Sequence, residues 1–413
     1  IEYSLTANRA VLDIASRERE NLLYNIYRMG KNSIDRGSRD SWTASPSDIA
    51  AVKAAMEKDR AAAAGAETGA TREGTGAGAV GDPIFQFGRG ADPKYFTDVL
   101  RAPAHRDPRG YILPSDQPDF LTATKFVNAL RHVGIDVMRA TSAFTVAGTR
   151  YPAGSYVVKS AQAFRPMVLD MFEPQDHPND FAYPGGPPKR PYDNAGYTLA
   201  FQMGVHFDRI LDGFDGPFQP INGLATPPVG TVANASGAAG FLVSHAVNDA
   251  YVAVNRALKA KADVFVLDAP MTANGKRYPA GTFYIAANGT TTPMLQQLAR
   301  TIGLSADGTA ARPGAGATHL RPVRIALWDQ YGGSMPSGHT RWLLEQFEFP
   351  FEVVYPKTLD AGNLASKYDV LVLPSGAVPS SDRASGRRFN NAGDSDVPAE
   401  YRDRLGRVTV AET

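Results

Sequence analysis

The sequence contains no cysteine, and this absence excludes several kinds of site at once. The chain can form no disulfide bond, no thiolate metal site and no cysteine nucleophile. The absence does not identify a compartment, since a protein without disulfides can be cytosolic or exported. Zinc motifs of histidine and glutamate are missing too, because none of the seven histidines begins an HxxE, HxxH or HExxH pattern.

Long hydrophobic runs and an excess of one charge are also missing. No apolar stretch approaches the roughly 18 residues that a membrane-spanning helix needs. Lys and Arg total 43 while Asp and Glu total 42, so a net charge of +1 gives no field that would attract nucleic acid. The first residues include neither an initiator Met nor the regions of a signal peptide. We therefore expect a part of a longer protein.

An internal repeat is the clearest positive signal. Three pairs of segments match, the last two at an offset of 127 residues: GYIL at 110–113 with GFLV at 240–243, VNALRHVGIDV at 127–137 with VNRALKAKADV at 254–264, and RYPAGSYVV at 150–158 with RYPAGTFYI at 277–285. Each copy predicts a strand, a helix, a strand, a turn and a strand. Phe126, Val127 and Leu130 give the first helix its apolar side, and Gly134 suits its C-terminal end. The sequence therefore predicts two related α/β units.

The segments before and between the copies have weaker patterns. Residues 3–30 carry apolar side chains spaced three, four or seven apart, which predicts an amphipathic helix whose apolar face needs a partner. A short helix is expected at 49–60, and the Ala, Gly and Thr of 61–82 predict a flexible segment. The Pro- and aromatic-rich loop 172–220 should be ordered, with a short helix at 197–205.

Strands and helices alternate after Leu320. VRIALW, FEVVYP and YDVLVLP are apolar runs typical of buried strands, and the helix GHTRWLLEQFEF and a helical turn near 359–364 separate them. This order predicts a doubly wound parallel sheet with about three strands.

The loop from Gly332 to Thr340 reads GGSMPSGHT, which has the glycine spacing of a phosphate-binding loop. His339 holds the lysine position, and it is too short and mostly neutral to reach the β- and γ-phosphates. A Walker-B strand should end in an acidic residue, and VLVLP ends in Pro374. We expect a strand-to-helix turn in which the first two glycines bend the chain and Ser337 or Thr340 caps the helix.

Binding candidates come from the loop and the repeat. Asp176, His177 and Asp180 form the densest group that could hold a cation, although such residues in a Pro-rich loop also form turns. Tyr151 and Tyr278, from the two RYPAG segments, could contact a peptide or glycan or could pack the hairpins.

Candidates for chemistry are weaker. Ser375 follows the last predicted parallel strand, where α/β sheets place ligands, and an independent enzyme could use Ser375 or His339. Asp208, Asp212 and Asp215 lie close in sequence but lack the alternating oxygen ligands of a calcium loop, so turn or surface roles are expected. We assign no catalytic or metal-binding residue.

Several long segments resemble one protein family. RERENLLYNIYRMGKNSIDRGSRDSWTASPSDIAAV resembles the segment that follows the catalytic domain in large bacterial zinc carboxypeptidases of the carboxypeptidase A-like family. DPRGYILPSDQPDF, FTVAGTRYPAGSYVVKSAQAFRPMVLDMFEPQDHP and PYDNAGYTLAFQMGV resemble their accessory region. VRIALWDQYGGSMPSGHTRWLLEQFEFPFEVVYP resembles their C-terminal domain, which has a class I glutamine amidotransferase-like fold. The resemblance covers most of the chain apart from 61–82.

The resemblance implies an exported enzyme that removes C-terminal residues from peptides, with one Zn²⁺ and a glutamate general base. None of these residues can be assigned here, because the residues before Arg17 are too few for a catalytic domain and no HxxE occurs. Without cysteine, glutamine amidotransfer is excluded as well. We therefore expect the non-catalytic C-terminal part of a secreted or periplasmic zinc carboxypeptidase, with no cofactor of its own and the missing catalytic domain as its partner.

This interpretation divides the chain into five parts. They are 1–38, the last helix of the catalytic domain; 39–82, a linker; 83–222 and 223–318, the two accessory α/β units; and 319–413, a truncated amidotransferase-like domain. Two alternatives stay open. The chain could be a peptide- or glycan-binding module, or an independent hydrolase on the amidotransferase-like fold.

Overall fold

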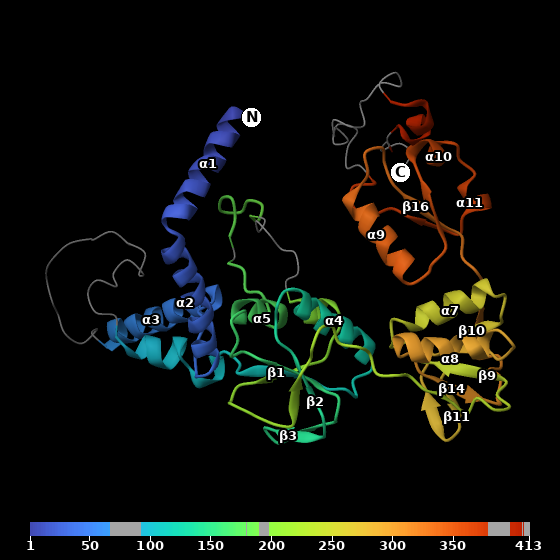
Figure 1. The fold of residues 1–413 in the computed structure, drawn as a ribbon, viewed down its shortest axis with the longest axis horizontal. Helices are drawn as coiled ribbons and strands as arrows, with labels where there is room; N and C mark the ends of the chain where they lie inside the picture. The colour runs from blue at the N-terminus through green and yellow to red at the C-terminus, as the bar shows by residue number, and fades with distance from the viewer. Residues whose placement is uncertain (67–91, 179, 190–197, 379–396, 407, 409–413) are drawn as a thin grey trace. The chain divides into compact units, whose positions relative to one another are not determined.

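The structure, a computed structural model, describes residues 1–66, 92–178, 180–189, 198–378, 397–406 and 408 (Figure 1). The chain divides into two compact units, Ile1–Thr226 and Pro227–Thr413. Both combine helices with sheets, so the predicted α/β class is confirmed. None of the helices in the described ranges is long and apolar enough to cross a membrane. Most of the predicted flexible segment 61–82 lies outside these ranges.

Two consecutive helices, α1 (Glu2–Arg17) and α2 (Arg19–Gly37), replace the single helix predicted at the N-terminus (Figure 1). Glu18 interrupts the helical geometry only locally. Its N–H donates to the Ile14 carbonyl at 2.9 Å, and its carbonyl accepts from the Leu22 N–H at 2.9 Å. The helix expected at 49–60 is the longer α3 (Pro46–Ala66), which is followed later by a π-helix, Tyr95–Leu100, and a 3₁₀ turn, Pro103–His105.

The rest of the first unit is built on a five-stranded antiparallel sheet with the order β6-β1-β5-β2-β7. Its strands are β1 (Gly110–Leu113), β2 (Met138–Ala140), β5 (Tyr156–Lys159), β6 (Asp208–Ile210) and β7 (Phe218–Pro220). The remaining elements are α4 (Phe120–His132), the hairpin β3 (Phe144–Val146) and β4 (Thr149–Tyr151), α5 (Arg165–Phe172) and α6 (Leu199–Gln202). The predicted helix at 197–205 is therefore shorter than expected, and residues 190–197 lie outside the described ranges.

Alternation along the strands gives this sheet two apolar faces. Tyr111 and Leu113 of β1 pack with Phe126 and Leu130 of α4, whose apolar side was predicted correctly. Between them, Ile112 points to the opposite face and packs with residues of the β3–β4 hairpin. Helices thus cover one face of the sheet, and a hairpin covers the other.

The second unit contains a six-stranded sheet with the order β15-β10-β13-β9-β14-β8. Its elements are β8 (Val232–Ala233), β9 (Gly240–Val243), α7 (Ala250–Lys259), β10 (Val264–Leu267), the hairpin β11 (Met271–Ala273) and β12 (Lys276–Tyr278), β13 (Phe283–Ala286), α8 (Thr291–Ile302), β14 (Ala306–Thr309) and β15 (Ala317–Leu320). Without β8, its order β14-β9-β13-β10-β15 repeats that of the first sheet, and the matching sequence segments occupy equivalent strands.

A three-stranded parallel sheet completes the second unit, with the order β17-β16-β18. Its elements are β16 (Ile325–Trp328), α9 (Met335–Gln346), β17 (Phe351–Val354), α10 (Pro356–Asp360), α11 (Leu364–Lys367), β18 (Val370–Val372) and the 3₁₀ segment Ala399–Arg404. All three strands lie where the apolar runs predicted them. The boundary expected between 318 and 319 falls inside β15, because that strand pairs with β10.

Candidate functional site

The two RYPAG tyrosines are structural. In the first unit the Tyr151 side chain is buried, stacks on Phe144 and donates its hydroxyl to the Asp208 carboxylate at 2.8 Å. Burial and this bond raise the pKa of Tyr151 above its ordinary value. The bond ties the β3–β4 hairpin to strand β6, so the Tyr151 hydroxyl stabilises the fold.

The second unit repeats this arrangement. Tyr278 is buried and donates its hydroxyl to the Asp307 carboxylate at 2.8 Å, and Lys276 pairs with the same carboxylate at 2.9 Å. Burial alone would raise the pKa of Asp307, but the bonds from Lys276 and Tyr278 outweigh it and leave the pKa below its ordinary value. In the strand register, Asp208 lies opposite Ile112 of β1 and Asp307 lies opposite the equivalent Leu242 of β9. Both hairpins are therefore held at the same position of their sheets.

The acidic loop has separate local roles. Asp176 accepts the backbone N–H of Ser47 at 2.8 Å in the first turn of α3, and the bonds from Ser47 lower the pKa of Asp176. Asp180 pairs with Lys189 at 3.1 Å. His177, which lies between Asp176 and Asp180 in the sequence, is exposed. Within the described ranges, no group of three His, Asp or Glu side chains is arranged to hold a metal ion.

The GGSMPSGHT loop joins β16 to α9, as the sequence predicted, but its helix cap is a different residue. Ser334, and not Ser337 or Thr340, is the N-cap, and its hydroxyl accepts the Ser337 N–H at 3.5 Å. The Asp329 carboxylate accepts the N–H groups of Gln330 and Ser334 at 2.8 and 2.9 Å. The N–H groups of Gln330, Ser334 and Ser337 are therefore bonded to side chains instead of being open to a phosphate.

The two catalytic candidates, Ser375 and His339, lie beyond the C-terminal ends of strands β18 and β16 of the parallel sheet. Ser375 is exposed in the turn after β18, and His339 is exposed on α9. No hydrogen bond joins the two side chains within the described part of the chain. A serine nucleophile needs a base in hydrogen-bond contact, so this arrangement does not prepare Ser375 for catalysis.

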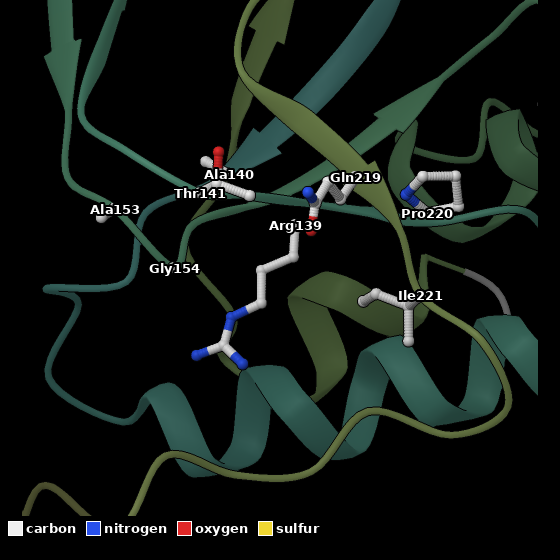
Figure 2. A pocket seen from close by; sticks show the side chains of 8 residues that line it. All are labelled: Arg139, Ala140, Thr141, Ala153, Gly154, Gln219, Pro220 and Ile221. Atoms are coloured by element: carbon white, nitrogen blue, oxygen red, sulfur yellow. The ribbon is translucent and has the colours of Figure 1, made fainter.

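The first unit has a solvent-open cavity of about 540 Å³ beside its sheet, lined in part by Ala153 and Gly154 of the first RYPAG segment (Figure 2). It is formed by the end of β2, the β4–β5 turn and β7, with the lining residues Arg139, Ala140, Thr141, Ala153, Gly154, Gln219, Pro220 and Ile221. Gly154 has a φ of +87°, which suits glycine at this tight turn. Figure 2 shows the Arg139 side chain extending from β2 on the side of Gly154.

Arg139 was missed because single arginines carry no motif. The repeat did contain a signal, since the offset of 127 residues places Val266 opposite Arg139 in the alignment of the two copies. A charged residue at a position where the other copy has valine is not required by the shared fold. That difference marks the cavity as the candidate functional site of the described chain.

Comparisons of the chain with family models, with curated proteins and with solved structures found no match.

Proposed function

We propose that this chain is the non-catalytic accessory region of a secreted or periplasmic zinc carboxypeptidase, and that α1 and α2 hold it against the catalytic domain. Zn²⁺ and the peptidase residues would belong to that catalytic domain. The resemblance of the segment from Arg17 onward supports this assignment, because in the family that segment directly follows the peptidase fold.

The observation that carries the proposal is the uncovered apolar surface of α1 and α2. Eleven of their large apolar side chains are at least 45% exposed: Tyr3, Leu5, Val11, Leu12, Ile14, Leu22, Leu23, Tyr24, Ile26, Tyr27 and Met29. Their burial would stabilise an interface, at about 25 cal/mol for each Å² removed from water. Large apolar side chains exposed in this number on two consecutive helices indicate an interaction site. A covalently attached catalytic domain is the partner that the family resemblance supplies.

The far end of α2 is fixed to the first sheet. Gly37 approaches the sheet so closely that a Cβ atom there would lie 2.2 Å from the Ser160 carbonyl oxygen. Arg109 donates its Nε to the Gly37 carbonyl at 3.0 Å and its Nη2 to the Ser38 carbonyl at 2.5 Å. A domain bound to the apolar residues of α1 and α2 would therefore be connected firmly to the accessory region.

The first test is the coding sequence upstream of Ile1. We expect it to encode an HxxE motif with a later His and Glu, and an initiator codon directly before Ile1 would contradict the proposal. The chain alone, supplied with Zn²⁺, should release no C-terminal residue from a peptide.

The second test measures binding of the encoded catalytic domain to this chain. Leu12→Asp and Ile26→Asp place charges on exposed apolar positions, so they should leave the accessory region folded but weaken binding at least tenfold. Val229→Asp is the matched control, because Val229 is also an apolar residue, 73% exposed, but lies outside α1 and α2. Equal binding by all three variants would show that α1 and α2 do not form the interface.

A further inference from the structure

The Arg139 guanidinium is a charge without a partner. It forms no hydrogen bond or ion pair with any side chain or carbonyl in the described ranges, although the residue is only partly exposed. Its Nη2 atom lies near the β4–β5 turn, 3.5 Å from the position of a Cβ on Gly154, and Ser115 is the other side chain close to that position. Most other arginines of this unit that are equally buried bond to carboxylates or carbonyls, as Arg109 and Arg165 do.

An unpaired guanidinium that is partly removed from water costs free energy, and a bound anion would offset this cost. The second sheet shows that the fold itself does not need the charge. Val266 occupies the position of Arg139, since Val266 pairs with Phe283 and with β15 just as Arg139 pairs with Tyr156 and β7.

The cavity surfaces around Arg139 restrict the kind of anion. Arg139, Thr141 and Gln219 give the cavity lining polar side chains, and Pro220 and Ile221 add apolar ones. The lining therefore offers hydrogen-bond partners beside a limited apolar surface. The planar guanidinium presents paired donors that match the two oxygens of a carboxylate. Arg139 is the only cationic residue among those that line the cavity, so the lining balances the single charge of a carboxylate and not the double charge of a phosphate.

The edge strand β7 excludes one way of binding. Pro220 has no N–H, and the Phe218 N–H already donates to the Gly216 carbonyl at 2.7 Å. A peptide therefore finds few backbone donors for pairing as an additional strand at this edge. Side chains in the cavity, and not the backbone of β7, must hold the ligand.

We propose that this cavity binds a small organic carboxylate, and that Arg139 pairs with the carboxylate. A peptide C-terminus and a free carboxylic acid share this chemistry. The site does not depend on the proposed role of α1 and α2, because its lining residues come from the sheet and its β4–β5 turn.

Ligand-observed NMR on the full chain tests the proposal with N-acetyl-leucine, N-acetyl-leucine amide, hexanoate, glucuronate and inorganic phosphate as probes. N-acetyl-leucine or hexanoate should bind, and the amide, which lacks the charge, should bind at least tenfold more weakly. Binding of N-acetyl-leucine in preference to hexanoate would identify a peptide C-terminus as the source of the carboxylate, and the reverse would identify a free acid.

Arg139→Val introduces the residue that the second sheet already tolerates, so the variant should keep its circular dichroism spectrum and its melting temperature. It should bind the carboxylate about 10- to 100-fold more weakly, as expected for a lost charge-assisted hydrogen bond. Arg150→Gln removes an exposed arginine outside the cavity and should bind like wild type.

Four results would overturn the proposal. They are unchanged binding by Arg139→Val, equal loss in Arg150→Gln, stronger binding of phosphate than of every carboxylate probe, and no binding of any probe. If Arg139→Val fails to fold, Arg139→Gln takes its place with the same expected loss.

Discussion

Replacing Asp107 should detach the linker after α2 from the first sheet. The Asp107 carboxylate accepts the Ser41 hydroxyl, the Thr43 N–H and the Thr43 hydroxyl, each at 3.0 Å, and the Arg165 Nη2 at 2.5 Å. The side chains of Asp107 and Arg165 are only 10% and 4% exposed. Asp107→Ala would leave the Arg165 charge buried without a carboxylate, which costs about 3–5 kcal/mol.

Hydrogen exchange measured by mass spectrometry can locate this loss. At about 1.4 kcal/mol per factor of ten, the amides of Thr43 and Asp107 should exchange on the order of 100- to 5,000-fold faster. Peptides from α7 and α8 in the other unit provide an internal reference that should not change. Asp107→Ala combined with Arg165→Met should recover part of the stability, because no stranded charge remains.

Asp212→Ala is the matched control for Asp107→Ala. Asp212 also pairs with an arginine, Arg106, at 3.1 Å, but its side chain is 80% exposed. A surface ion pair of this kind contributes about 0–1 kcal/mol, so exchange should change less than about fivefold. If Asp107→Ala changes exchange as little as Asp212→Ala does, then the buried pair does not hold the linker and the reasoning is wrong.

Three further predictions concern the second unit. The pKa of Tyr278 is raised in the folded protein, so the stability that Tyr278 contributes is complete below the unfolded pKa of about 10 and should be lost as the pH rises toward the folded pKa. Circular dichroism will follow the unfolding, and absorbance at 295 nm will follow the ionisation of tyrosine. Tyr278→Phe should lower the free energy of unfolding in urea by about 1.5 kcal/mol and remove this pH dependence. The pKa of Asp307 is lowered, so its stabilisation is present above about pH 4 and should be lost as the pH falls below that value, and Lys276→Met should reduce this loss in an acid titration. Ser334→Ala removes the α9 cap and should lower stability by about 1 kcal/mol in urea unfolding, whereas Thr340→Ala should have little effect.

Local patterns in the sequence predicted the elements well. Phe126, Val127 and Leu130 are all fully buried on α4, because a helix with one apolar side has few other ways to exclude those side chains from water. The repeated RYPAG segments likewise marked two hairpins in equivalent positions. Periodicity is a property of neighbouring residues, and so a single sequence is enough to detect it.

Contacts between distant residues could not be predicted in the same way. Asp107 and Arg165 are 58 positions apart, and nothing in either local sequence indicates that they pair. The cap of α9 was assigned to Ser337 or Thr340, because spacing does not show that β16 ends at Trp328 and leaves Ser334 free to cap. The positions of strand ends and the pairs of distant side chains depend on the whole sheet.

The repeat separates what the fold requires from what it does not. Both copies keep the tyrosine that binds an aspartate on the equivalent strand, β6 or β14, since Tyr151 and Tyr278 hold equivalent hairpins. Only the first copy has a charge at the position of Arg139, where the second copy has Val266. A residue that both copies share is explained by the stability of one common architecture. A buried or half-buried charge that one copy alone carries needs a different explanation, and a ligand for the first unit supplies it.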